Sequence, residues 1–200
     1  MILMDFKKYR ILISVVAIII AMGTVMNNID WFLKILFPIH YKDLIYENAI
    51  YYDIDPYLVA AIIKTESKFY EKAISSKNAR GLMQIAPITG KWASEELHIE
   101  NYTEELLFIP NINIRIGCWY LSVLRKEFDG NLQLMLAAYN GGSGNVRKWL
   151  KDPRYSKDGT KLHDIPFYET KNYVEKVMRN YSIYRFIYTE NAAIQWSFIF

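Results

Sequence analysis

The spacing of apolar residues is the feature that most restricts how this chain can fold. From residue 41 onwards, apolar side chains recur at intervals of three and four, as from Leu58 to Ala61 and Ile62, and strand-type alternation is almost absent. Such intervals place side chains on one face of a helix. No repeat of roughly 20 to 50 residues and no low-complexity tract interrupts the pattern. The spacing therefore predicts an all-α fold.

Helix boundaries are indicated by residues that commonly begin and end helices. Asp55 followed by Pro56 is typical of a helix start, because aspartate caps the first turn and proline fits the first helical position. The pair Gly141-Gly142 predicts a helix end, and Ser143 is expected to cap the short helix that follows. The further expected helices cover residues 110–128, 131–139, 143–150 and 169–188, with a polar, turn-rich segment over 151–163.

Glu66 ends the apolar helical run that starts at Pro56. Ile62 and Ile63 precede it by four and three positions, so its carboxyl group emerges beside apolar neighbours. Desolvation disfavours the charged form of a carboxyl group and raises its pKa. An acid tuned in this way can donate a proton to a leaving oxygen and later take one back. The alternative interpretation, a surface glutamate at a helix end, would be preferred if Glu66 stood alone.

Residues 11–29 contain no charged side chain, a run of 19 positions. As a helix the run would be about 28 Å long, close to the roughly 30 Å hydrocarbon core of a bilayer. Three basic residues precede it and Asp30 follows it, which places the N-terminus in the cytoplasm. The run predicts a single-pass cell-membrane anchor with the rest of the chain on the extracytoplasmic side. A signal peptide cleaved near Gly23 would instead secrete the domain, and a buried core helix is a third alternative.

Composition and this run divide the chain into four parts. The net charge is +3, of which +2 falls within residues 1–29, so the remainder is nearly balanced. That balance excludes the basic face of a nucleic-acid-binding protein. We expect a cytoplasmic stub with an anchor or signal peptide over 1–29, a membrane-proximal connector over 30–40, one globular domain over 41–188, and a tail over 189–200 for which the sequence indicates no role.

Residues that commonly bind metals or form covalent intermediates are scarce. Cys118 is the single cysteine, and we expect a small buried apolar residue and not a nucleophile, because no neighbouring histidine could activate it. His40, His98 and His163 are scattered along the chain and predict no metal site. There is no His-Glu-x-x-His, phosphate-loop or paired-cysteine motif, so no cofactor is expected.

Four short segments occur in an order and spacing typical of one enzyme family. They are Glu66-Ser67, residues 81–85 (Gly-Leu-Met-Gln-Ile), residues 137–142 (Ala-Ala-Tyr-Asn-Gly-Gly) and residues 165–174, where Ile-Pro-Phe-Tyr-Glu-Thr precedes Tyr-Val. Together they resemble the lytic transglycosylase domain of the soluble lytic transglycosylase type, a relative of goose-type lysozyme. The resemblance covers residues 41–188, about three quarters of the chain.

The resemblance implies an all-α, lysozyme-like transglycosylase domain, here preceded by one N-terminal membrane-spanning helix. Its activity would be cleavage of the β-1,4 bond between N-acetylmuramic acid and N-acetylglucosamine. Its partner would be the glycan strands of peptidoglycan, with no nucleic acid, no metal and no cofactor. Glu66 matches the family's catalytic acid. The substrate-binding residues that the resemblance implies are Ser75, Met83, Gln84, Tyr139, Asn140, Glu169 and Tyr173.

The chemistry of these residues suits such roles, although each also has a structural interpretation. Gln84 offers a donor and an acceptor to acetamido and hydroxyl groups, or caps a turn. The ring of Tyr139 can be buried while its hydroxyl points into a groove, or it is a core tyrosine. Asn140 is expected to satisfy backbone groups of the following turn, and Glu169 suits a helix start as well as a groove. Gly81 is expected to allow close backbone approach.

Two positions depart from the family's pattern. Asn78 stands where glycine is common, a minor change because asparagine tolerates left-handed backbone better than most residues. Ala86 stands where methionine is common, near the floor of the family's cleft. We expect this second change to reshape a sugar subsite without affecting the acid.

The sequence leaves three interpretations of the function open. Many glycosidases use two carboxylates, whereas the resemblance implies that Glu66 alone protonates the glycosidic oxygen and then deprotonates the 6-hydroxyl, giving a 1,6-anhydro product. A muramidase that uses water would need a carboxylate such as Asp129 or Asp164 to hold that water. A wall-binding module without activity is the alternative outside enzymes, and the intact set of site residues argues against it.

Overall fold

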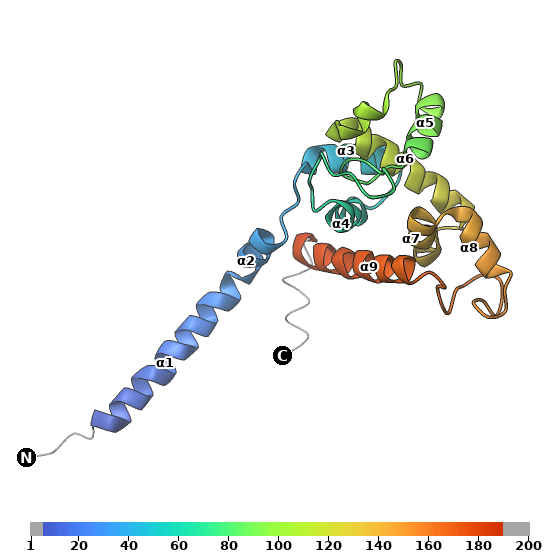
Figure 1. The fold of residues 1–200 in the computed structure, drawn as a ribbon. Coiled ribbons are helices and arrows are strands. Elements are labelled where there is room, and N and C mark those ends of the chain that lie inside the picture. Colours follow the sequence, from blue (N-terminus) through green and yellow to red (C-terminus); the bar gives the residue numbers. More distant parts are fainter. Residues whose placement is uncertain (1–5, 190–200) are drawn as a thin grey trace, which may run out of the picture. The chain divides into compact units, whose positions relative to one another are not determined.

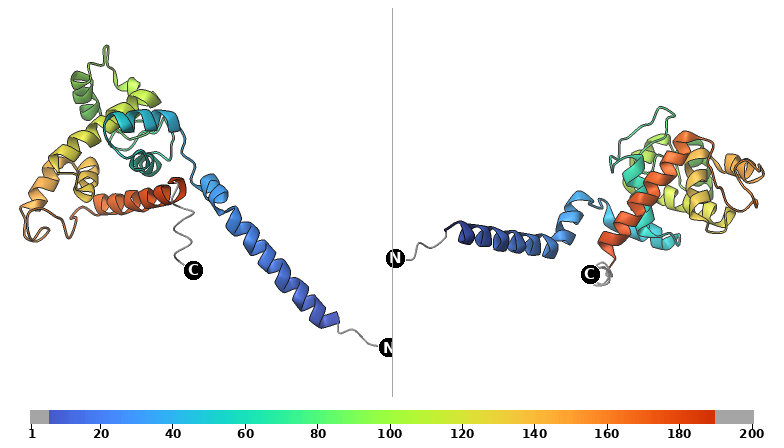
Figure 2. Two further views of the ribbon diagram at one scale, coloured as in Figure 1. Left: turned by 180° about the vertical axis from the view of Figure 1, so that it is seen from behind. Right: turned by 90° about the horizontal axis from the view of Figure 1, so that it is seen from below.

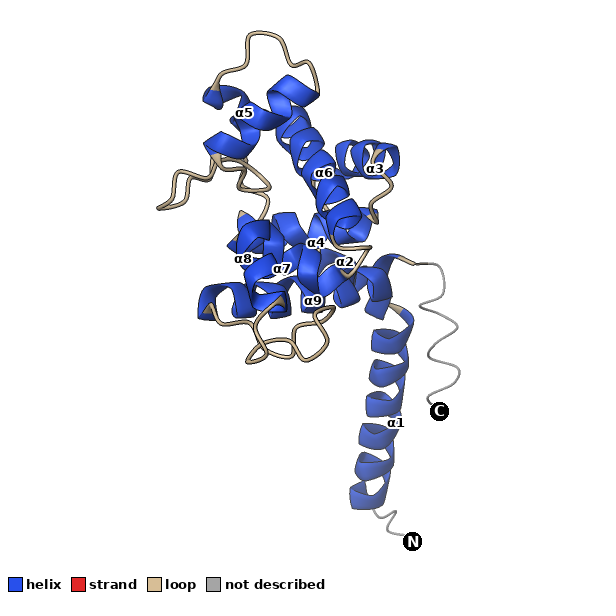
Figure 3. Ribbon diagram, turned by 90° about the vertical axis from the view of Figure 1, so that its right-hand side faces the viewer, coloured by secondary structure: helices blue, strands red, loops and turns tan. Residues whose placement is uncertain are grey.

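The computed structural model describes residues 6–189, and for residues 6–8, 26, 27 and 30 it describes the backbone alone. Within this range the regular structure is helical (Figures 1 and 3). The strand-like pairing there consists of isolated bridges that join Arg80 to Ile74 and to Ile85. The expectation of an all-α fold is therefore confirmed for the described part of the chain. Residues 190–200, most of the expected tail, lie outside it.

The chain divides into two compact units, residues 1–38 and residues 39–200. The described part of the first unit holds α1 (Phe6–Asn27) and α2 (Ile29–Leu36). Among the described residues, no helix combines the length and the apolar character that crossing a membrane requires. The spanning helix expected over residues 11–29 is therefore not confirmed, and part of the expected connector over 30–40 is helical.

The second unit carries the expected helices with small changes of boundary. The sequence pattern indicates no individual bounds for three of its elements, α3, α5 and the short 3-10 helix η1. Its helices are α3 (Lys42–Tyr51), α4 (Pro56–Glu66), α5 (Pro87–Glu96), η1 (Glu104–Phe108), α6 (Pro110–Glu127), α7 (Leu132–Gly141), α8 (Ser143–Leu150) and α9 (Tyr168–Tyr188).

Helix α4 is the buried centre of this unit. The Asp55 carboxylate accepts a hydrogen bond from the Tyr57 backbone N–H at 2.8 Å, which confirms the expected cap. Every residue from Leu58 to Ile63 is buried, so this stretch contacts protein on all sides. α9 packs alongside α4, as Figures 1 and 2 show. Tyr181 reinforces the pair, because its hydroxyl donates to the other Asp55 carboxylate oxygen at 2.7 Å.

The start of α8 differs from the expectation. Ser143 is the first helical residue and makes no capping hydrogen bond, since Gly142, with φ of +87°, occupies the cap position. Asn145 instead closes this turn by donating to the Gly141 carbonyl oxygen at 2.8 Å. A serine next to a double glycine indicates a turn, but the sequence does not show which of the three residues carries the cap.

Helix α6 holds the loop between α4 and α5 in place through one side chain, Asn113. This side chain is fully buried. Its amide nitrogen donates to the backbone carbonyls of Arg80 at 2.9 Å and Leu107 at 2.7 Å. Its amide oxygen accepts from the backbone N–H of Met83 at 2.7 Å. One asparagine therefore bonds to three backbone groups, and it is the partner of the Leu107 carbonyl and the Met83 N–H, whereas the Arg80 carbonyl also accepts from the Ile85 N–H at 3.0 Å.

Close packing accompanies these three hydrogen bonds of Asn113. A Cβ atom on Gly117 would lie 2.2 Å from the Met83 sulfur, so glycine leaves room on α6 for this methionine of the loop. The neighbouring Cys118 is fully buried, as expected, and burial raises the pKa of its thiol far above the usual range. The sulfur therefore stays protonated and packs as an apolar group.

Replacing Asn113 by alanine should lower the free energy of unfolding by on the order of 3 kcal/mol, because the Leu107 carbonyl and the Met83 N–H lose their partner and the Arg80 carbonyl loses one of its two. Urea denaturation measures the change. Asn131→Ala is the matched control: it removes one capping hydrogen bond, to the Leu134 N–H, and should cost about 1 kcal/mol. Equal losses in the two variants would contradict the role of Asn113 in holding the loop.

Candidate functional site

The Glu66 carboxyl group lies where three helices meet at a cleft of about 400 Å³. It is the last residue of α4, and α7 contributes Asn140 near its own C-terminal end. The first turns of α9 supply most of the remaining wall, including Glu169 and Tyr173. The full lining is Thr65, Glu66, Asn140, Tyr168, Glu169, Asn172, Tyr173 and Lys176.

The pKa of Glu66 is raised from its ordinary value of 4.5 to about 7. Burial is the main cause, and the negative charge of Glu169 adds to it. Tyr173 opposes part of the rise, because its hydroxyl is close enough to favour the carboxylate, although it makes no hydrogen bond of ordinary geometry. Near neutral pH the carboxyl group is therefore about half protonated and able to act as both donor and acceptor of a proton.

Two tyrosines lie near this carboxyl group. The rings of Tyr139 and Tyr173 are parallel within 2°, with centroids 6.5 Å apart. Burial and the nearby Glu66 charge raise both phenol pKa values well above their usual range, so both hydroxyls stay protonated. Tyr139 does not line the cleft, contrary to the expected orientation of its hydroxyl. Instead it donates to the Met83 backbone carbonyl at 2.9 Å, and so ties α7 to the loop.

Gln84 and Ser75 form hydrogen bonds within the loop between α4 and α5, and neither lines the cleft with Glu66. The Gln84 side-chain nitrogen donates to the backbone carbonyls of Ala73 at 3.1 Å and Gly81 at 2.8 Å. Its expected donor is thus engaged inside the protein, which leaves the amide oxygen for other partners. The Ser75 hydroxyl oxygen accepts from the backbone N–H groups of Lys77 and Ala79 at 3.2 and 3.0 Å.

The expected close approach at Gly81 is confirmed. Its φ is +76°, and a Cβ atom there would lie 2.1 Å from the Leu107 carbonyl oxygen. The tight contact with a backbone atom requires glycine, and the left-handed backbone favours it. Asn78, where the family commonly has glycine, also adopts positive φ, at +60°. The asparagine there keeps the turn geometry, as expected.

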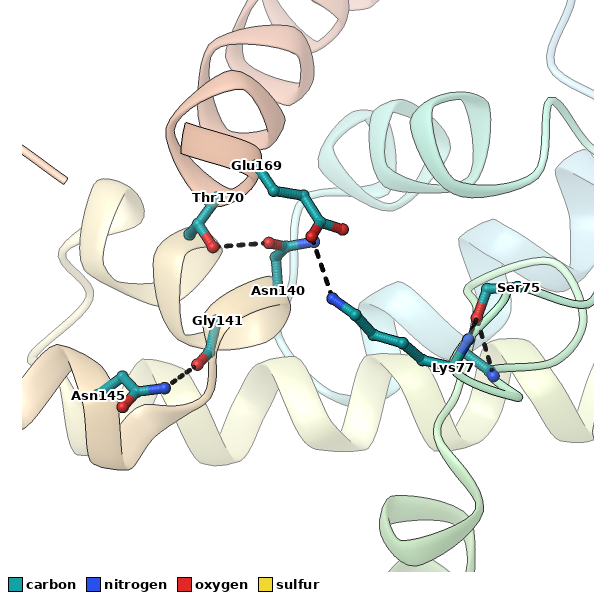
Figure 4. A network of polar contacts seen from close by, with 8 residues as sticks. Ser75, Lys77, Asn140, Gly141, Asn145, Glu169 and Thr170 are labelled. Atoms are coloured by element: carbon teal, nitrogen blue, oxygen red, sulfur yellow. Dashed lines mark hydrogen bonds and ion pairs between the residues drawn. The ribbon is translucent and has the colours of Figure 1, made fainter. Parts of the chain in front are cut away.

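An ion pair bridges the loop and the start of α9. The Lys77 ammonium lies 3.0 Å from a Glu169 carboxylate oxygen, and both side chains are largely exposed (Figure 4). Such an exposed pair contributes little to stability. Its effect is local: it sets a positive charge beside the carboxylate that shares the cleft with Glu66.

Asn140 bonds to a side chain of α9, whereas it was expected to bond to the backbone of the following turn. Its amide oxygen accepts a hydrogen bond from the Thr170 hydroxyl at 2.8 Å (Figure 4). The backbone of the following turn is satisfied by Asn145. The expectation that Asn140 caps that turn is therefore wrong, because α9 brings Thr170, which is distant in sequence, to the end of α7.

The two aspartates considered for holding a water molecule do not line this cleft. Asp129 borders a separate hollow with Arg125. Asp164 pairs with the Lys171 ammonium at 2.8 Å, and this hydrogen bond lowers the pKa of its carboxyl group. Within the described residues, Glu169 is the second carboxylate of the cleft. No group of three His, Cys, Asp or Glu side chains that could hold a metal ion occurs in the same range.

Several lining residues were not identified from the sequence. Asn172 and Lys176 follow Glu169 at three and seven positions, so they share one face of α9 with Tyr173. This helical spacing could have identified them once Glu169 was placed in the cleft. Thr65 and Tyr168, each next to a predicted residue, carry no comparable signal.

A comparison with known proteins gives the family. The family model described as "Transglycosylase SLT domain" matches residues 43–162. A putative soluble lytic murein transglycosylase of Haemophilus influenzae is 40% identical over 59% of this chain and 20% of its own length. The soluble lytic murein transglycosylase of Escherichia coli K12 is 35% identical over 75% of this chain and 24% of its own length.

The solved structures agree with the sequence comparison. An inactive mutant of the lytic transglycosylase Slt from Pseudomonas aeruginosa matches with a TM-score of 0.67 and 35% identity, over 76% of this chain and 25% of the other. The chain thus spans about a quarter of the length of these relatives, or less. Since the family model covers more than half of the chain and the fold agrees, this protein belongs to the transglycosylase SLT domain family.

Proposed function

We propose that the chain is a peptidoglycan lytic transglycosylase that cleaves the β-1,4 bond between N-acetylmuramic acid and N-acetylglucosamine and leaves 1,6-anhydromuramic acid ends. The observation that carries the proposal is the Glu66 carboxyl group, held at a cleft with a pKa of about 7 in a domain of the SLT family. The names of the relatives support the reaction type.

In the first step the protonated Glu66 carboxyl donates its proton to the glycosidic oxygen as the bond to C1 breaks. The acetamido group of the muramic acid stabilises the positive charge that develops at C1. The Tyr173 hydroxyl, which stays protonated and lies near Glu66, stabilises the carboxylate that results. The N-acetylglucosamine side leaves with the donated proton.

In the second step the Glu66 carboxylate removes the proton of the 6-hydroxyl of the same sugar, and the oxygen bonds to C1. The proton returns to Glu66, so the enzyme ends the cycle as it began and no water is consumed. The attack is intramolecular, so little further entropy is lost in bringing the reacting atoms together. One residue with a pKa near neutrality can therefore perform both proton transfers.

The geometry favours this mechanism over a water-using muramidase. Glu169 is the remaining carboxylate of the described cleft, and it is exposed and paired with Lys77. An enzyme that holds an attacking water would need this residue as its base. A wall-binding module without activity would have no use for an acid with a raised pKa.

The purified chain, incubated with peptidoglycan, should release muropeptides that mass spectrometry finds lighter by one water molecule than their hydrated forms. Glu66→Gln should lose this release almost entirely, because the amide cannot donate the proton. Hydrated reducing ends would point to the muramidase, for which Glu169→Gln is the next variant to assay. Binding without release by the folded native chain would favour the wall-binding module.

The raised pKa of Glu66 also predicts a pH dependence of stability. The folded state binds more protons than the unfolded state between pH 4.5 and about 7, so the free energy of unfolding falls as pH rises through this window. Glu66→Gln removes the effect and should be more stable than the native chain by on the order of 3 kcal/mol above pH 7. The difference should vanish below pH 4.5. Urea denaturation across this range measures it.

Glu169→Gln serves as the companion variant in that series. Removing the Glu169 charge takes away one of the causes of the raised pKa, so the Glu66 midpoint should move down. The fall of activity with rising pH should begin at lower pH by the same amount. A midpoint that stays unchanged would contradict the contribution assigned to Glu169.

We also propose that residues 1–29 attach the chain to the cell membrane with the SLT domain on the extracytoplasmic side. The 19 uncharged residues from 11 to 29 and the basic residues before them support this arrangement. The chain expressed in bacteria should remain in the membrane fraction after alkaline washing, with an intact N-terminus by mass spectrometry. Ile19→Arg should reduce this retention. A shortened N-terminus would indicate a cleaved signal peptide instead.

A further inference from the structure

Helix α5 displays two large apolar side chains to solvent. Ile88 is 77% exposed and Trp92, one turn later, is 41% exposed. The opposite face of the helix is buried through Gly90, Ala93 and Ser94. Large apolar side chains at adjacent helical positions on an otherwise polar surface are typical of a contact site for another molecule.

The Trp92 ring is held in place from one side. It packs against Trp119 with centroids 4.7 Å apart at 71°, and against Tyr120 at 6.3 Å and 80°. Both contacts are edge-to-face, the arrangement that aromatic pairs favour. A side chain already fixed by its neighbours loses little conformational entropy when a ligand stacks on it.

A row of aromatic rings connects Trp92 to the catalytic cleft. Tyr120 lies 5.5 Å from Tyr139, which in turn lies 6.5 Å from Tyr173 beside Glu66. Three ring-to-ring steps therefore lead from the exposed indole to a ring that lines the cleft. Trp92 thus belongs to the same series of packed aromatic rings as Tyr173 in the wall of the candidate active site.

Two hollows border the same side chains. One, of about 430 Å³, is lined by Ile88, Thr89, Lys91, Trp92 and Glu95. The other, of about 510 Å³, shares Ile88, Lys91 and Glu95 with it. The surface therefore offers an aromatic ring together with a hydroxyl, an ammonium and a carboxylate.

This combination fits a sugar. A pyranose ring presents C–H groups on its face and hydroxyl and acetamido groups around its rim, so its face suits the indole and its rim suits the polar side chains. The balance of one lysine and one glutamate gives no preference for a strongly charged ligand. The only strand of sugars that the proposed reaction brings to this molecule is the substrate itself.

We propose that Trp92, with Ile88 beside it, forms a subsite for the glycan strand outside the Glu66 cleft, where one N-acetylated sugar stacks on the indole while a bond further along the strand is cleaved. The inference rests on the proposed function. It makes cleavage dependent on strand length: strands that reach α5 bind more tightly than oligosaccharides that end within the cleft.

The test compares the native chain with Trp92→Ala on peptide-free glycan strands of graded length. For long strands, KM should rise about tenfold, which corresponds to about 1.4 kcal/mol of stacking energy, while kcat stays the same. For the shortest cleaved oligosaccharide, both constants should be unchanged. Trp92→Phe, which keeps an aromatic ring, should restore most of the affinity for long strands.

The matched control is Tyr51→Ala, because Tyr51 is an 80%-exposed aromatic residue on α3 that lines neither hollow. It should leave KM unchanged at every length. An equal loss on short and long strands in Trp92→Ala would overturn the proposal, as would a loss that appears only with strands that carry peptides.

A binding measurement separates this inference from the proposed function. In the Glu66→Gln background, calorimetry with peptide-free strands should show about tenfold weaker binding when Trp92→Ala is added. Trp92-dependent binding by a native chain that does not cleave the strands would refute the proposed reaction and support the subsite. Cleavage that is unchanged by Trp92→Ala at every strand length would refute the subsite and support the reaction.

Discussion

The burial of α4 on all sides is the constraint on which the site depends. A fully buried Leu or Ile side chain contributes about 1.5–3 kcal/mol, and α4 buries an unbroken stretch from Leu58 to Ile63 between its neighbours. This packing fixes the helix axis and therefore the position of its last residue, Glu66. The carboxyl group then lies at the C-terminal end of a helix, where the helix dipole also disfavours a negative charge. The apolar packing of α4 thus offsets the desolvation of the acid.

The surroundings of Glu66 balance two opposing requirements. A fully desolvated carboxyl would hold its proton too tightly to act as an acid, whereas an exposed one would lose it below neutral pH. Burial and Glu169 raise its pKa, and the Tyr173 hydroxyl limits the rise, with a value of about 7 as the result. Lys77, on the loop between α4 and α5, pairs with Glu169 at 3.0 Å. Two side chains of α9, Glu169 and Tyr173, therefore adjust the one proton-transfer group at the end of α4.

Much of the fold follows from local signals, and the errors share one cause. The Asp55 cap, the long helices and the buried Cys118 were all correctly expected, since each depends on residues close together in the sequence. The contacts of Tyr139 and Asn140 were not, because their partners, Met83 and Thr170, lie far away along the chain. The hydrogen bonds of Asn113 to the loop were not predicted from the sequence for the same reason. An asparagine within a helix carries no local sign that it binds a distant loop.

The sequence by itself determined that the described chain is helical, that Glu66 ends an apolar helix, and that the segments of one enzyme family follow it in order. Helical spacing and capping are local properties, so they are readable from neighbouring residues. Only the tertiary structure decided which carboxylate shares the cleft with Glu66, which hydroxyls stay protonated beside it, and which amides are already engaged within the loop. These properties depend on burial and on distances between helices, which arise only when the helices pack together.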